Sequence, residues 1–255
     1  MHELPLVFLT LLAQTAAGIT LFATLALFIS KLDSDEYNKV MFVALISISL
    51  GGIASLFHLG QPLRAINAFM GVGRSPMSNE IVATVIFGGL LFLTVALGWM
   101  KKSLALVKTL GLLASIAALV LIAIIPTIYT LATVPQWNTI FTPMQMILTA
   151  LSMGAVVVHL FSKERLFAYA TVLFVIVSIA IIPMYFAHVN ATAPALLQKD
   201  LLFWTLKMVF AGLALAAILP TKAKYNAAAS FAVVFLLASE LCGRIGFYDF
   251  WQIGM

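Results

Sequence analysis

Eight long apolar runs divide this chain from one end to the other. They cover roughly residues 4–30, 39–59, 77–100, 104–130, 143–161, 165–189, 200–219 and 225–247. A helix needs about 20 apolar residues, at a rise of 1.5 Å per residue, to cross about 30 Å of hydrocarbon. The runs are continuous rather than alternating, which favours helices over the strands of a membrane barrel. The pattern therefore predicts an all-α integral membrane protein with about eight transmembrane helices.

Composition supports this fold class and leaves no room for a soluble domain. Of the 255 residues, 63% are hydrophobic and 9% are charged, and the mean hydropathy is +1.12. So few charges cannot cover the aqueous surface of a globular protein. The first run starts at Leu4, with no basic segment before it and no clear cleavage site, so we expect it to be a retained helix. Residues 1–255 are predicted to form a single polytopic membrane domain.

The distribution of basic residues predicts the orientation. The loops after the first, third, fifth and seventh runs contain nine Lys and Arg residues, which are Lys31, Lys39, Lys101, Lys102, Lys108, Lys163, Arg165, Lys222 and Lys224. The opposite side contains four, which are Arg64, Arg74, Lys199 and Arg244. The positive-inside rule then places both termini in the periplasm of a bacterial inner membrane. This asymmetry accounts for the net charge of +5 and gives no reason to expect nucleic acid as a partner.

Several polar residues lie deep within the predicted helices. By helical rise, Lys207 is about 10 Å below the outer face and Gln14 about 13 Å below it, while Glu240 is about 22 Å above the inner face. Arg244 follows Glu240 by one turn. Because these depths nearly coincide, we predict one network of Gln14, Lys207, Glu240 and Arg244, with Gln14 as a hydrogen-bond donor. A structural role between helices is favoured over a catalytic one.

Two further ionisable residues lie at the outer ends of helices. His58 ends the second run, and Glu80 lies about one turn into the third. Ser75 and Pro76 are typical of a helix start, with Ser as the cap and Pro at the first position. The residues alone leave two roles open for His58 and Glu80. They belong either to a functional site or to the hydrated headgroup layer, where ionisation costs little.

Cofactor chemistry within the chain is limited by its residue types. One cysteine, Cys242, cannot ligate an iron–sulfur cluster, which takes about four. No phosphate-binding or dinucleotide-binding motif is present. A haem held between His58 and His188 is a minor alternative. We therefore expect no haem, no iron–sulfur cluster and no metal site in this chain.

Other features are predicted to be architectural. Small-residue pairs suit close helix packing, prolines inside runs suit kinks, and tryptophans near helix ends suit interfacial anchoring. The residues concerned are Gly51, Gly52, Gly88, Gly89, Pro126, Pro183, Trp99, Trp137 and Trp251.

Four sequence blocks together resemble a known family. The most specific block is HLGQPLRAIN at 58–67, followed by VG at 72–73 and SNEI at 78–81. The others are HELPL at 2–6 with Gln14 and Gly18, VPQW at 134–137 with TPM at 142–144, and ELCGRIGFY at 240–248. In collinear order over nearly the whole chain, they resemble the membrane anchor subunit of the anaerobic dimethyl sulfoxide reductase family. The sequence departs from the family pattern in being somewhat shorter and in having Lys207 where Arg is expected.

This resemblance implies a function for the outer-face residues. Such an anchor oxidises menaquinol near the periplasmic face and passes electrons to a four-cluster ferredoxin-like iron–sulfur subunit, which serves a molybdopterin catalytic subunit. The resemblance implies catalytic roles for His58 and Glu80, and quinol binding by these two residues together with Arg64 and Asn67.

Three other functions remain open at this point. A secondary transporter would place polar groups at the membrane midplane, whereas here they gather toward one face. An anchor of the polysulfide-reductase type shares the quinol chemistry but serves another acceptor. A purely structural tether would bind no quinol.

Overall fold

The computed structural model describes residues 4–57, 67, 69–219 and 225–251, and within these ranges eight helices are long and apolar enough to cross a membrane. They are α1 (Leu4–Phe28), α2 (Ser34–Leu56), α3 (Pro76–Trp99), α4 (Leu104–Ile124), α5 (Phe141–Ser162), α6 (Arg165–Thr192), α7 (Pro194–Ile218) and α8 (Tyr225–Asp249). A short 3₁₀ helix, η2 (Ile125–Ile128), continues α4. The predicted all-α membrane fold with eight spans is confirmed.

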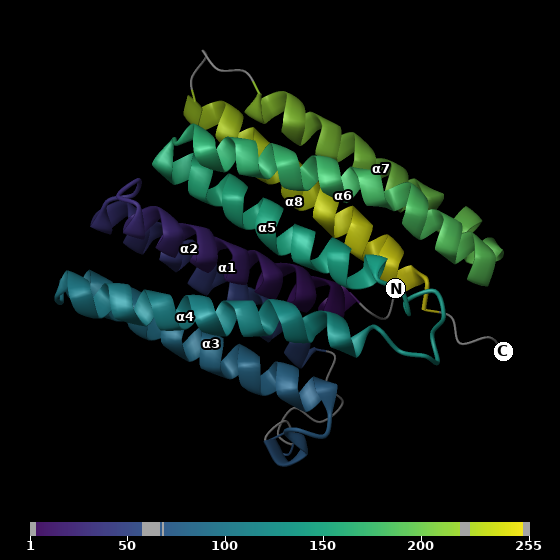
Figure 1. The fold of residues 1–255 in the computed structure, drawn as a ribbon, viewed down its shortest axis with the longest axis horizontal. Coiled ribbons are helices and arrows are strands. Elements are labelled where there is room, and N and C mark those ends of the chain that lie inside the picture. The colour runs from purple at the N-terminus through teal and green to yellow at the C-terminus, as the bar shows by residue number, and fades with distance from the viewer. Residues whose placement is uncertain (1–3, 58–66, 68, 220–224, 252–255) are drawn as a thin grey trace.

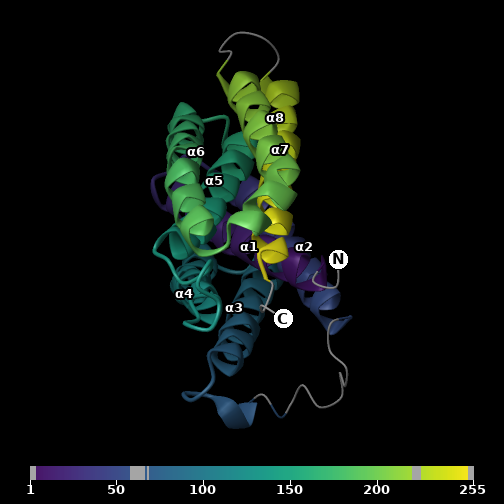
Figure 2. The same cartoon turned by 90° about the vertical axis from the view of Figure 1, so that its right-hand side faces the viewer.

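Helix α1 lies at the centre of the bundle and contacts α2, α4, α5 and α8. Figure 1 shows α3 and α4 on one side of the α1–α2 pair and α5 to α8 on the other. The 90° view in Figure 2 shows α7 and α8 side by side, as their extensive contact requires. The polar groups on α1, α5 and α8 therefore face one another inside the bundle.

The connections alternate between the two ends of the bundle. At one end, Lys31 after α1 forms an ion pair of 3.4 Å with Glu164 before α6. At the other end, the Tyr248 hydroxyl near the close of α8 lies 3.5 Å from the Leu6 carbonyl oxygen at the start of α1. The first and last helices thus begin and end at the same end of the bundle, as an even number of spans requires. That this end is periplasmic stays a prediction.

Local chemistry sets several helix limits. Ser75 caps α3 and Pro76 takes its first position, as predicted. Helix α2 begins at Ser34, before the predicted start at residue 39, because the Asp33 carboxylate accepts from the Glu36 N–H at 2.7 Å. Pro126 has no N–H to continue the α-helical pattern, and the chain tightens into η2 there rather than kinking a long helix.

Further predicted limits and bends differ in detail. Helix α7 begins at Pro194, six residues before the predicted start at 200, and Pro194 occupies its first turn. Pro183 lies inside α6, which runs on to Thr192. At Pro194 the missing N–H is one of the first-turn donors that have no partner within an α-helix.

Helices α1 and α5 cross with their backbones in direct contact. A Cβ atom added to Gly18 would lie 1.8 Å from the Ala150 carbonyl oxygen, and one added to Gly154 would lie 2.3 Å from the Gly18 carbonyl carbon. The predicted close-packing role holds for Gly51, whose added Cβ would lie 3.3 Å from Leu9 and Leu12 atoms. It is wrong for Gly52, Gly88 and Gly89, where an added Cβ meets no atom of the described residues within 4 Å. Those three glycines face outward, so no neighbouring helix needs them.

The tryptophans also divide into two kinds. Trp99 and Trp251 are exposed at helix ends, where an interfacial ring is expected. Trp137 is 0% exposed, stacks on Phe247 with ring centroids 4.8 Å apart and donates to the Phe247 carbonyl oxygen at 2.9 Å. The predicted anchoring role of Trp137 is therefore wrong, because the 129–140 connection folds back over the end of α8 and buries the ring.

Candidate functional site

Of the residues predicted to bind quinol, His58 and Arg64 lie outside the described residues. Asn67 is exposed in the connection between α2 and α3. Glu80 is buried in the first turns of α3, with 8% of its surface exposed. The described part of the predicted site thus consists of one buried carboxylate and one exposed amide.

Glu80 is buried at the end of the bundle where α1 begins and α8 ends. Helix α3, which carries Glu80, contacts η2, and Tyr129 directly follows η2. Tyr248 is in the last turn of α8, at the same end of the bundle. A carboxylate so far removed from water is costly to ionise, and such residues in membrane proteins are usually functional or paired.

The two tyrosines form a buried pair that sequence reasoning missed. Their hydroxyls hydrogen-bond to each other, and their rings meet edge to face at 5.5 Å. Trp137 and Phe247 enclose the Tyr129 ring. Burial raises the pKa of the Tyr129 hydroxyl well above its usual range, and negative charge on Tyr248 or Glu80 would raise it further. Tyr129 therefore stays protonated at physiological pH, and its hydroxyl oxygen accepts the hydrogen bond that Tyr248 donates.

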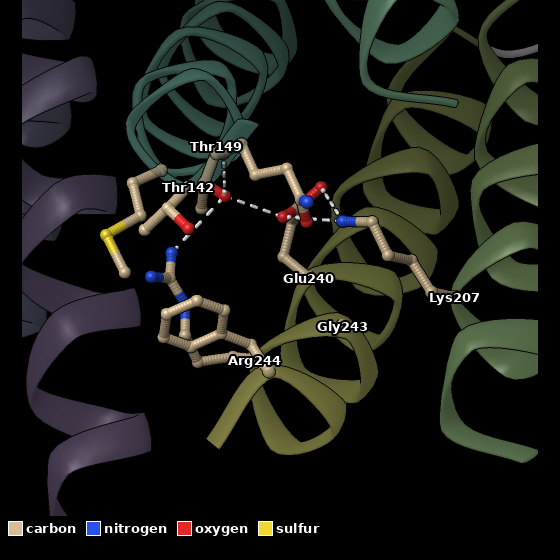
Figure 3. Close-up of a pocket in the computed structure, with 9 residues that line it drawn as sticks. Thr142, Thr149, Lys207, Glu240, Gly243 and Arg244 are labelled. Carbon is tan, nitrogen blue, oxygen red and sulfur yellow. Dashed lines mark hydrogen bonds and ion pairs between the residues drawn. The ribbon is translucent and has the colours of Figure 1, made fainter. Parts of the chain in front are cut away.

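The deeper polar residues meet between α1, α5, α7 and α8. The Lys207 Nζ donates to both carboxylate oxygens of Glu240, at 3.0 and 3.1 Å, and both side chains are buried. The Thr149 hydroxyl on α5 donates to the same carboxylate at 2.7 Å. Figure 3 shows Lys207 and Thr149 approaching Glu240 from two different helices. The sequence predicted the ion pair by depth but not the threonine.

Arg244 connects this ion pair to α1. Its Nη2 donates to the Gln14 Oε1 at 2.6 Å and to the Thr149 hydroxyl at 3.4 Å. Gln14 therefore accepts a hydrogen bond here, whereas it was predicted to donate one. Its own Nε2 finds no partner among the described residues. The reason is that Arg244 offers only donors, so the amide must present its oxygen.

A small cavity lies inside this network. Its polar lining includes Gln145, Thr149, Lys207, Glu240 and Arg244, and its volume is about 10 Å³. That is room for about one water molecule. Gln145 lines the cavity, and its buried Nε2 has no partner among the described residues. The cavity is far too small for a quinol, which supports a structural role for the network.

The alternative haem site has little support from His188. Its Nε2 lies 2.9 Å from the Pro135 carbonyl oxygen, which occupies the nitrogen that an axial ligand would use. Within the described ranges, no three His, Cys, Asp or Glu side chains gather as a metal site would require.

Known proteins resemble this sequence over nearly its whole length. A model of the family described as DMSO reductase anchor subunit (DmsC) matches residues 1–250. The sequence is 31% identical over 275 residues to a chain of the anaerobic dimethyl sulfoxide reductase of Escherichia coli (strain K12), with 97% of this chain and 94% of that relative covered. It is 29% identical over 270 residues to the anaerobic dimethyl sulfoxide reductase chain YnfH of the same organism, with the same coverage.

A third relative matches more closely over a shorter part. This chain of the anaerobic dimethyl sulfoxide reductase of Haemophilus influenzae is 38% identical over 159 residues, which cover 60% of our sequence and 56% of the relative. The eight apolar helices agree with a multi-pass protein of the bacterial inner membrane. The protein therefore belongs to the DMSO reductase anchor subunit family and serves as a membrane anchor of a DMSO reductase complex.

Proposed function

We propose that this anchor oxidises menaquinol at the outer end of the bundle and passes the electrons to an iron–sulfur subunit. The observation that carries the proposal is the position of Glu80. It is a buried carboxylate in the first turns of a transmembrane helix, in a chain of this family. A buried base at the end of the bundle is suited to take a proton from a membrane-soluble hydroxyl donor.

The chemistry balances with two proton acceptors. Oxidation of one quinol to quinone releases two protons and two electrons. In the proposed mechanism His58 accepts one proton from a quinol hydroxyl, since a neutral imidazole is a suitable base near neutral pH. Glu80 accepts the second proton and later returns it to the outer water. Arg64 and Asn67 are proposed to bind the quinone oxygens, and the electrons leave one at a time to the partner subunit.

Partners and orientation follow from the same proposal. The outer end of the bundle faces the periplasm and binds a four-cluster ferredoxin-like subunit, which in turn contacts a molybdopterin catalytic subunit. The supporting observations are the basic loops at the opposite end and the relatives' description as chains of dimethyl sulfoxide reductase.

The test is menadiol oxidation by the purified complex with its partner subunits. We expect Glu80→Gln to lower the rate by about 10²-fold or more, because general-base catalysis contributes roughly that factor. We expect His58→Ala to cause a loss of at least the same size. Both variants are also tested for saturable binding of a quinol analogue.

The matched control is Glu36→Gln, the same change at an exposed carboxylate that pairs with Lys39 at the other end of the bundle. It should leave the rate unchanged. A normal rate in Glu80→Gln would remove Glu80 from the mechanism. Absence of quinol binding in the native complex would instead leave the protein as an anchor without a quinol site.

A further inference from the structure

A cleft of about 260 Å³ opens at the end of the bundle where α3 ends and α4 begins. It is bounded by the first turns of α2, the last turn of α3 and the first turn of α4. Its polar lining includes Ser34, Asp35, Asn38, Lys101 and Lys102. Glu80 lies at the opposite end of α3, so this cleft is separate from the proposed quinol site.

The cleft combines two cations with one anion. Lys101 and Lys102 lie in the connection between α3 and α4, and Asp35 lies in the first turn of α2. In the described part of the chain, none of these three side chains forms an ion pair. Charges of both signs that stay unpaired in one cleft are suited to a ligand that also has charges of both signs.

Asn38 adds a buried polar group without a partner to this cleft. Only 8% of its surface is exposed, and its Oδ1 has no hydrogen-bond partner among the described residues. A Cβ atom added to Gly98 would lie 2.1 Å from this oxygen, so the amide packs directly against the backbone of α3. A buried amide oxygen without a donor is unfavourable. A ligand with N–H groups in the cleft would supply that donor.

The start of α4 and the depth of the cleft favour a phosphate-bearing ligand. The first turn of α4, all of which is described, has no acidic residue, and the Ser103 hydroxyl accepts from the Leu106 N–H at 3.3 Å. Other N–H groups of a first helical turn attract anions such as phosphate. The 24 residues of α3 extend about 36 Å, which exceeds the hydrocarbon thickness of about 30 Å. The cleft at the end of α3 therefore lies at the level of lipid headgroups.

We propose that this cleft binds the headgroup of a membrane phospholipid of the ethanolamine class. Lys101 and Lys102 bind the phosphate group, beside the first turn of α4. The ammonium group donates to the Asp35 carboxylate and to the Asn38 amide oxygen. The helix dipole and the positive-inside rule account for lysines at this end of the bundle. They do not account for a carboxylate and an unpartnered amide in the same cleft, whereas a zwitterionic headgroup pairs with all of these groups.

The experiment is thermal unfolding of the full chain in lipid-free detergent, with increasing amounts of a short-chain phosphatidylethanolamine. We expect a saturable rise of about 5 °C in the unfolding midpoint, because a ligand that binds only the folded state stabilises it. Phosphatidylcholine with the same acyl chains should raise the midpoint by less than about 1 °C, since its trimethylated nitrogen has no N–H to donate. Phosphatidylglycerol keeps the phosphate but lacks the cation, so about tenfold more of it should be needed.

Removal of both lysines tests the phosphate site. Lys101→Gln with Lys102→Gln should weaken phosphatidylethanolamine binding by about tenfold or more, because charge-assisted hydrogen bonds are lost. The matched control is Lys39→Gln with Lys163→Gln, which removes the same charge from the same end of the bundle but outside the cleft. Lys163 also shares the left-handed backbone of Lys101, with φ of 57° and 51°. The control should keep the full rise in midpoint.

Asn38→Leu separates lipid binding from stability. Without lipid, this variant should be at least as stable as the native protein, because it removes a buried polar group that has no partner among the described residues. Its rise in midpoint with phosphatidylethanolamine should nevertheless be clearly smaller. A purely structural role for the amide predicts the opposite, namely a lower midpoint without lipid and an unchanged rise with it.

Four results would overturn the proposal. Equal rises with phosphatidylethanolamine and phosphatidylcholine would mean that the acyl chains alone bind. An equal effect of phosphatidylglycerol would remove the ammonium site. An equal rise with O-phosphoethanolamine, the headgroup without its lipid, would make the cleft a site for a soluble phosphate ester. An equal loss in the Lys39 and Lys163 control would mean that only the overall charge of this end matters.

Discussion

Glu240→Gln is expected to lower the free energy of unfolding by about 3–5 kcal/mol, because it leaves a buried cation without its partner. Lys207 and Glu240 are both buried, and each is the other's direct ionic contact. Lys207→Met should cost less than Glu240→Gln. The carboxylate left behind keeps its hydrogen bond from Thr149, whereas Glu240→Gln leaves the buried Lys207 ammonium without its anionic partner.

The measurement is denaturant-induced unfolding of the purified protein in detergent micelles. The double variant Lys207→Met with Glu240→Met should recover much of the loss, since replacing a buried pair by apolar groups of similar size is often neutral. Lys39→Met with Glu36→Met is the matched surface pair, and it should change stability by less than about 1 kcal/mol. Equal losses in the buried and the exposed pair would contradict this assignment.

Gly154→Ala is expected to destabilise the bundle by about 2–3 kcal/mol, because the new methyl group meets the backbone of α1 rather than a movable side chain. Gly18→Ala should have at least the same effect, since its Cβ would lie closer to the facing backbone. Alanine has the higher helix propensity by about 1 kcal/mol, so any loss of stability reports the clash.

Gly88→Ala on α3 is the control for these changes, as its added Cβ meets no atom within 4 Å in the part of the chain that the structure describes. It should be neutral or slightly stabilising in the same unfolding assay. A neutral Gly154→Ala would mean that α1 and α5 can separate without loss, and the central crossing would not hold the bundle together.

The proposed quinol site and the ion-pair network differ in how much of each could be predicted. Lys207 and Glu240 were matched by depth, because helical rise alone converts sequence position into height in the membrane. Glu80 was found for the same reason, and Tyr248 was detectable by its four-residue spacing from Arg244. Tyr129 gave no such signal, because it lies in a connection whose path depends on what it packs against.

The sequence by itself determined the number of spans, the cap at Ser75 and the heights of the buried charges. These depend on local quantities, namely the free energy of transferring each segment from water into hydrocarbon and the hydrogen bonds of a helix's first turn. Tertiary structure decided that Gly18 and Gly154 rather than Gly88 form the close crossing, and that Gln14 accepts from Arg244. When a helix is apolar on every side, its sequence pattern does not indicate which face turns inward. The rotation of each helix about its axis is therefore set by its packing against the others.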